Sequence, residues 1–384
     1  MNTLLNGSSH QVIIIGGGLA GLVNAIHLSK NGIRVLLIEK NEYPRHKVCG
    51  EYISNEVLPY LQYLGIDPFD FGAVDINRFE LSTIKGKTIK TDLPLGGFGI
   101  SRYALDDILY KRAISLGASV ACDSVTNITF FDKEDRFKIN CKSGTEYETE
   151  IVIGAYGKRS NLDVSLNRSF IKGKSPYLGV KAHYKGAFPS DLVALHNFEG
   201  GYCGVSKVEN DHINICYLAD YSTFKKFKDI QTFEEEVITK NPNLKEIFNN
   251  CTPVFDKPLT ISQVSFLPKA TIENHILMSG DSAGMIHPLC GNGMGMAIHS
   301  GLLLSQSILE FKEGKIKSRE IMEATYAKAW NKTFSKRLFA GKLFNSFFGR
   351  DKVLGFGLNA LTLVPFLLPH IIKQTHGDPL TVER

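Results

Sequence analysis

The sequence predicts an α/β protein in which an antiparallel sheet is inserted into a domain built on a parallel sheet. Three observations predict it: a strand, glycine turn and helix over residues 11–40, two later apolar strands that also end in glycines, and alternating strands rich in aromatic residues over 177–264. The parallel-sheet domain is expected at 10–75, 98–175 and 266–310, the antiparallel sheet at 76–97 and 176–265, and a helical region at 311–384.

The first segment carries the strongest signal. Residues 12–15 are four apolar β-branched residues, as in a strand buried on both faces. Gly16, Gly18 and Gly21 follow at the G-x-G-x-x-G spacing, which lets the backbone approach a pyrophosphate and pack the next helix on the sheet. The second strand ends at Glu39, where a carboxylate accepts hydrogen bonds from a ribose diol. This segment predicts a Rossmann-like site, and the acid at position 39 favours FAD or NAD over NADP.

Composition limits the classes of function. The 384 residues are 43% hydrophobic, enough for a large core, and the net charge of +5 is too weak to indicate nucleic acid binding. Seven scattered cysteines without a CxxC pair predict no metal site and favour a reducing cytoplasm. The first ten residues lack the pattern of a secretory signal, so we expect a cytoplasmic protein.

The loop YPRHKVCGEYIS at 43–54 places Arg45 and Lys47 beside the glycine turn, where they are suited to meet phosphates. Its P-R-x-K-x-C-G-E pattern resembles the corresponding loop of the geranylgeranyl reductase branch of FAD-dependent oxidoreductases, relatives of the aromatic-ring hydroxylases. The resemblance implies a p-hydroxybenzoate-hydroxylase-like fold with Cys49 on the substrate side of the flavin, as a candidate catalytic residue. A buried loop thiol without chemistry is the alternative. The resemblance also places Arg102, at a predicted helix start, against the FAD phosphates and ribityl chain.

A third segment, HILMSGDSAGMIHPLCGNGMGMAIHS at 275–300, resembles the second FAD signature of the same superfamily. There the resemblance implies that Asp281 holds the ribityl hydroxyls. Gly291, Gly293 and Met294 precede or open a helix whose N-terminus would face the flavin edge where negative charge develops on reduction. We expect all four residues to contact the cofactor.

Two departures from the family pattern concern the reaction. Residues 155–157 read Ala-Tyr-Gly where related flavoproteins carry Ala-Asp-Gly, which leaves open whether NADH, NADPH or another reductant visits the flavin. Residues 201–207, GYCGVSK, lack the tryptophans of the halogenase and prenyl reductase motifs, which argues against a halogenase and also weakens a strict prenyl reductase assignment. We expect NAD(P)H as a transient reductant.

The C-terminal region is predicted to be helical. Residues 331–350 combine phenylalanine and leucine with a basic side, as in an interfacial helix, and 353–372 are uncharged but interrupted by two prolines. A membrane span, peripheral docking on a membrane and a tunnel wall or core helix are all open.

The leading hypothesis is a flavin monooxygenase that hydroxylates a hydrophobic aromatic, quinone-like or isoprenoid compound. The alternative is reduction of isoprenoid double bonds, with a proton from a group such as Cys49. A hypothesis of another class is a non-enzymatic flavoprotein or electron-transfer module docked on a membrane.

Overall fold

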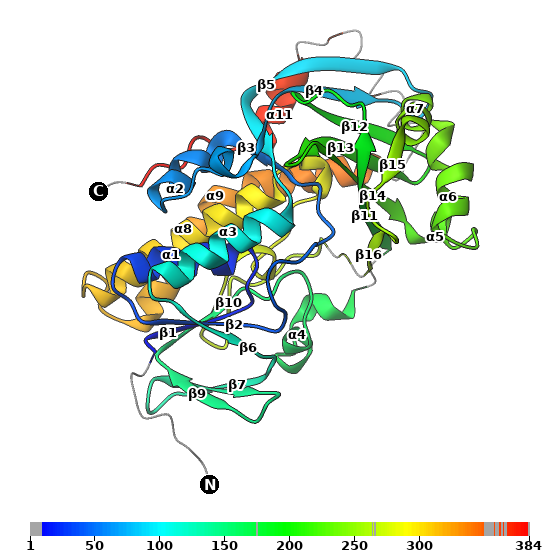
Figure 1. Ribbon diagram of the computed structural model, residues 1–384. Helices are drawn as coiled ribbons and strands as arrows, with labels where there is room; N and C mark the ends of the chain where they lie inside the picture. The colour runs from blue at the N-terminus through cyan, green and yellow to red at the C-terminus, as the bar shows by residue number, and fades with distance from the viewer. Residues whose placement is uncertain are drawn as a thin grey trace.

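The fold places two large sheets side by side, with the predicted cofactor segments at their junction (Figure 1). The computed structural model describes residues 10–173, 176–262, 264, 266–348, 357, 361, 364 and 367–382. One sheet is mainly parallel and the other mixed and mostly antiparallel, so the predicted fold class is confirmed.

The parallel sheet has the strand order β17-β18-β10-β1-β2-β6. Its strands are β1 (Val12–Ile15), β2 (Val35–Glu39), β6 (Ser119–Cys122), β10 (Ile151–Gly154), β18 (Ile276–Met278) and the antiparallel edge strand β17 (Ile272–Glu273). Helices α1 (Leu19–Lys30), α3 (Arg102–Ser115) and α8 (Gly293–Lys312) lie on one face, while the small sheet of β7 (Val125–Phe131), β8 (Arg136–Cys141) and β9 (Glu146–Thr149) lies on the other (Figure 1). β1 and β10 are fully buried, as the apolar sequences predict.

The second sheet has the order β15-β11-β14-β13-β12-β4-β5-β3, with β16 pairing with β11. Its strands are β3 (Tyr52–Ser54), β4 (Val74–Ser82), β5 (Thr88–Gly99), β11 (Tyr177–Gly186), β12 (Leu192–Phe198), β13 (Gly201–Val208), β14 (His212–Asp220), β15 (Cys251–Pro253) and β16 (Leu259–Ser262). Helices α5 (Tyr221–Phe224), α6 (Ile230–Glu236) and α7 (Pro242–Asn250) cover the side facing away from the cofactor segments (Figure 1). The predicted domain boundaries stay a prediction, and β3, from the expected range 10–75, belongs to this sheet.

Short helices complete the remaining connections. α2 (Leu58–Tyr63) follows β3, and α4 (Asn161–Ser165) follows the glycine turn after β10. Ser101 caps α3 by accepting a hydrogen bond from the Ala104 backbone at 3.0 Å.

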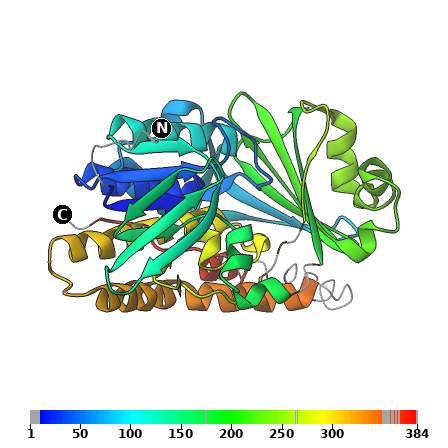
Figure 2. The ribbon, with the colours of Figure 1, turned by 90° about the horizontal axis from the view of Figure 1, so that it is seen from below.

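The long helix α9 (Arg319–Phe348) packs against α8 and extends along one side of the molecule (Figure 2). Phe334 is fully buried between the rings of His299 and Trp330, at centroid distances of 5.2 Å from each. The predicted interfacial helix is therefore wrong at Phe334, because this side chain packs against α8 inside the protein. The side chains of 342–350 and most of 353–366 lie outside the described part of the chain.

The last helix, α11 (Leu367–Thr375), packs against β5 and α9. Its Leu368 is buried. In the described part of the chain, no helix has the length and hydrophobicity needed to cross a membrane.

Candidate functional site

The glycine turn after β1 is packed as tightly as its spacing predicts. Gly16 has a φ of +104°, and a Cβ there would lie 2.4 Å from the Ala155 carbonyl oxygen. A Cβ on Gly21 would lie 2.0 Å from the Gly16 carbonyl oxygen. Gly18 is different, because its nearest neighbour would be the Arg102 guanidinium at 3.9 Å. Two glycines thus allow close packing, and Gly18 leaves the turn open toward the cavity.

Glu39 lies at the end of β2 and is 6% exposed. Its carboxylate accepts hydrogen bonds from the backbone of Gly17 at 2.7 Å and of Asn41 at 3.1 Å. Arg45, which we expected to meet phosphates, forms an ion pair with Glu39 at 2.9 Å. The Tyr43 hydroxyl donates to the Gly17 carbonyl at 2.6 Å, so the 43–51 loop is fastened to the glycine turn.

Lys47 and Arg102 meet at a carboxylate that the sequence did not single out. Asp106, on α3, is fully buried and lies 2.6 Å from Lys47 Nζ and 2.7 Å from Arg102 Nε. Burial, together with the nearby Arg102, lowers the pKa of Lys47 to about 8, against the opposing effect of Asp106. Burial raises the pKa of Asp106, but the two neighbouring cations outweigh it and hold the carboxyl ionised. Two cations around one anion leave a net positive charge, which suits a phosphate.

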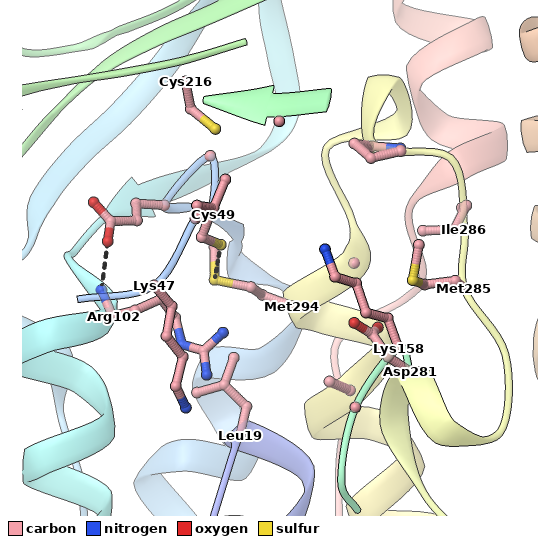
Figure 3. A pocket seen from close by; sticks show the side chains of 18 of the residues that line it. Leu19, Lys47, Cys49, Arg102, Lys158, Cys216, Asp281, Met285, Ile286 and Met294 are labelled. Atoms are coloured by element: carbon pink, nitrogen blue, oxygen red, sulfur yellow. Dashed lines mark hydrogen bonds between the residues drawn. The ribbon is translucent and has the colours of Figure 1, made fainter. Parts of the chain in front are cut away.

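Asp281 lies in the turn after β18, at the opposite wall of the cavity. Burial raises its pKa, and the nearby Lys269 and Lys158 oppose this rise. The Lys158 side chain lies beside Asp281 and extends into the cavity (Figure 3). Its pKa is lowered to about 8 by burial, against the effect of Asp281. We did not predict Lys158 as a site residue from the sequence, although a cation directly after the glycine turn at Gly157 could have indicated it.

Cys49 faces the segment that opens α8. Its Sγ lies 3.4 Å from Met294 Sδ, and both residues line the cavity together with Gly291 and Gly293 (Figure 3). Burial raises the pKa of Cys49, so the thiol is protonated at neutral pH. Cys216, on β14, lies on the other side of Cys49 from Met294 (Figure 3).

Residues from all of these segments line one continuous cavity of about 1110 Å³. This volume exceeds the roughly 300–1,000 Å³ that is usual for a small-molecule site, so a dinucleotide and a second molecule could share it. All twelve predicted site residues except Gly21 line its wall, and Gly21 acts behind it through the turn. The side toward the second sheet is apolar and includes Phe79, Leu195, Tyr202, Leu218, Ile261 and Val264, with Leu368 and Ile371 from α11.

These features fit FAD. The open turn at Gly18 would admit the pyrophosphate, the surplus cation of the Lys47, Arg102 and Asp106 group suits its charge, and Glu39 and Asp281 could hold its two polyol segments. Within the described residues, no cluster of three potential ligands could hold a metal ion. The fold and site together define an FAD-dependent oxidoreductase with a p-hydroxybenzoate-hydroxylase-like fold.

Comparison with known proteins gives the family. Residues 9–329 match the family described as FAD binding domain, and the chain belongs to it. Among curated proteins, it is 25% identical to the digeranylgeranylglycerophospholipid reductase of Methanococcus vannielii, over 86% of this chain and 84% of that protein. It is 24% identical to the menaquinone reductase of Mycobacterium tuberculosis, over 78% and 76% of the two chains. It is also 24% identical to conditioned medium factor receptor 1 of Dictyostelium discoideum, where the match covers 79% of this chain and only 64% of that protein.

Solved structures share the fold at lower identity. The halogenase PltM in complex with phloroglucinol and FAD has a TM-score of 0.74 at 16% identity, covering 90% of this chain and 78% of that chain. A flavoprotein/dehydrogenase from Cytophaga hutchinsonii has a TM-score of 0.75 at 18% identity, covering 89% and 86%. At such identities the likeness establishes the fold alone.

Proposed function

We propose that this protein reduces carbon–carbon double bonds of a long hydrophobic isoprenoid compound with FAD as cofactor. The observation that carries the proposal is the Cys49 thiol, which lies in the cavity wall between Met294 and the apolar sheet face and is protonated at neutral pH. Two of the curated relatives reported above are named as reductases of an isoprenoid lipid or of menaquinone, which supports the same class of substrate.

The cofactor would be held by residues from three distant segments. We propose Glu39 for the ribose, Asp281 for the ribityl hydroxyls, and the net positive group of Lys47, Arg102 and Asp106 for the pyrophosphate. Arg45 would keep its ion pair with Glu39 and so fix the carboxylate that faces the ribose. The remaining contacts would come from Gly16, Gly18, Gly21, Gly291, Gly293 and Met294. When bound and reduced, FAD supplies a hydride equivalent.

The protein would supply the apolar environment and the proton. The apolar side chains that line the cavity from the second sheet and α11 would limit water around a bound substrate. Cys49 can release a proton from Sγ to the carbon next to the one that receives hydride. A thiol with a raised pKa is a suitable acid for this step, since it keeps its proton until a strongly basic carbon develops.

Hydroxylation, our first hypothesis from the sequence, is the second candidate. The same apolar wall would also shield an oxygen-dependent reaction from water. It assigns no task to the protonated Cys49 thiol, and for that reason we place reduction first. NAD(P)H stays a prediction for the physiological reductant under either reaction.

The test uses purified protein loaded with FAD and reduced anaerobically with dithionite, so that the choice of nicotinamide does not matter. Digeranylgeranylglycerophospholipid and menaquinone are offered separately, and products are analysed by mass spectrometry. We expect addition of two hydrogens per double bond without oxygen, and loss of most of this activity in C49A with flavin content unchanged. Product that forms only after air is admitted and contains added oxygen would refute reduction and support hydroxylation.

A further inference from the structure

One positive charge in the cavity wall has no partner among the described residues. The side chain of Lys158 extends from the turn after β10 into the cavity (Figure 3). In that part of the chain its ammonium group forms no hydrogen bond or ion pair, and Asp281 lies beside it without reaching ion-pair distance. Burial lowers the pKa of Lys158 to about 8, so the group still carries its charge at pH 7. A half-buried ammonium ion is unfavourable without an anion, which indicates that one joins it from outside.

The turn that carries Lys158 is fixed to the turn that carries Asp281. Ser282 Oγ accepts a hydrogen bond from the Gly157 backbone at 2.9 Å and donates one to the Gly157 carbonyl at 3.1 Å. Lys269 Nζ donates to the carbonyls of Lys158 and Asp281, at 2.7 Å in each case. The Lys269 ammonium is therefore engaged by the backbone, whereas Lys158 is held at the cavity wall with its ammonium directed inward.

A second cation lies in the same wall. Arg159 follows Lys158, lines the cavity, and forms no ion pair with the residues that the structure describes. The carboxylate of Asp163, on α4, already pairs with Arg168 at 2.8 Å. Even with Asp281 fully ionised, the two cations leave this wall positive. An ammonium ion beside a guanidinium group is well suited to bind a phosphate.

The phosphates of FAD have another positive group available. Lys47 and Arg102 lie on the opposite wall, where they leave a net positive charge beside one carboxylate. Figure 3 shows the Lys158 side chain running from the wall that carries Asp281 into the space toward Cys49. Its charge is thus directed to the part of the cavity that remains for a second molecule.

An apolar surface begins on the same side of the cavity as Lys158. Met285 lies on that side (Figure 3) and packs against a buried cluster of Tyr202, Leu218 and Val264. Because Tyr202 lies on β13 and Leu218 on β14, this cluster continues into the apolar face of the second sheet. A molecule with a phosphate at one end and a long apolar chain matches both the cations and this surface.

We propose that Lys158 and Arg159 bind the phosphate group of an isoprenoid substrate, whose chain then lies along the apolar face of the second sheet. The inference rests on the proposed function and narrows its substrate class from hydrophobic isoprenoids in general to those with an anionic head. A simple isoprenoid phosphate and a phospholipid share this chemistry, and a quinone lacks it.

The first experiment measures binding and does not depend on turnover. Protein saturated with oxidised FAD is titrated by calorimetry with geranylgeranyl phosphate and with geranylgeraniol, which carry the same chain. We expect the phosphate to bind roughly tenfold more tightly, and K158M to lose most of this preference while its affinity for the alcohol stays the same. K158R, which keeps the charge, should retain the preference. Equal affinity for the two ligands in the wild type, or an unchanged preference in K158M, would overturn the site.

Two controls separate this site from the cofactor and from the general charge of the cavity. K40M removes an exposed lysine that lines the same cavity next to Glu39, and it should leave the preference unchanged. An equal loss in K40M and K158M would refute a specific site. The affinity for FAD is measured for each variant. A K158M protein that binds FAD much more weakly but keeps its preference for the phosphate would assign Lys158 to the cofactor instead.

A turnover measurement distinguishes a failure of this site from a failure of the proposed function. Digeranylgeranylglycerophospholipid and menaquinone are compared as substrates of the protein reduced with dithionite. We expect K158M to raise the KM for the phospholipid roughly tenfold and to leave that for menaquinone unchanged. If K158M weakens binding of geranylgeranyl phosphate without affecting the phospholipid, the substrate is a simple isoprenoid phosphate. If the wild type reduces neither compound but prefers the phosphate as expected, the proposed function fails and the anion site stands.

Discussion

His27 should make the stability of this protein fall steeply in mild acid. The side chain lies on α1, is 2% exposed, and shares a hydrogen bond of 2.8 Å between Nδ1 and the Tyr60 hydroxyl. Burial, with a smaller contribution from Lys30, lowers the pKa of His27 from its usual 6.5 to about 4. The native state therefore binds a proton here less readily than the unfolded chain does.

The sign and size follow from proton linkage. Because the native pKa lies below the unfolded one, the stability from a neutral His27 is complete above pH 6.5 and is lost as the pH falls toward 4. Each pKa unit corresponds to about 1.4 kcal/mol, so the loss between pH 6.5 and 5 is about 2 kcal/mol. That is a large share of the roughly 5–15 kcal/mol that stabilises a typical domain.

The measurement is urea unfolding of wild type and H27Q at pH 7 and pH 5. We expect H27Q to be less stable at pH 7, since it loses the bond to Tyr60, yet to lose about 2 kcal/mol less than the wild type on going to pH 5. Y60F is the matched control, because it removes the same bond and keeps the titrating imidazole. If H27Q and wild type lose the same free energy between the two pH values, the reasoning about His27 is wrong.

Three further predictions concern the cofactor and the second sheet. Purified Glu39→Ala and Asp281→Ala should each carry less FAD, with affinity weakened roughly tenfold or more, and full flavin absorbance in both would contradict their placement. Gly21→Ala forces a Cβ against the Gly16 carbonyl, so thermal unfolding should show a loss of about 1–3 kcal/mol, whereas an unchanged Tm would refute the packing argument. Burial raises the pKa of Glu234 to about 7, which makes its ionised form unfavourable in the native state. Glu234→Gln should therefore stabilise the protein by about 1–3 kcal/mol at pH 8 and much less at pH 4.5, and an equal effect at both pH values would contradict this.

Short sequence patterns were enough to predict residues on the cofactor side of the site. The other contacts depend on residues far apart in the sequence and could not be predicted in this way. The glycine turn and Glu39 lie within 30 residues, and their roles follow from spacing and strand ends alone. The partners of Glu51 could not be inferred, because Lys181 and His183 are 130 and 132 residues away. Both lie in YLGVKAHYKG, where polar residues in an alternating strand are normally expected to face water. In the structure that face of β11 meets the 43–51 loop, so the same alternation buries them.

The 43–51 loop links the cofactor site to the substrate sheet. Its residues Arg45, Lys47, Cys49 and Glu51 contact four different parts of the molecule, namely the end of β2, α3, the start of α8, and β11. Asp106 alone cannot balance the positive charges of both Lys47 and Arg102. An anion bound at Lys47 would supply the missing negative charge and would hold the loop more firmly against α3. The same restraint reaches Cys49 two residues later and Glu51 two residues beyond. Cofactor binding should therefore restrain further the loop that carries the Cys49 thiol.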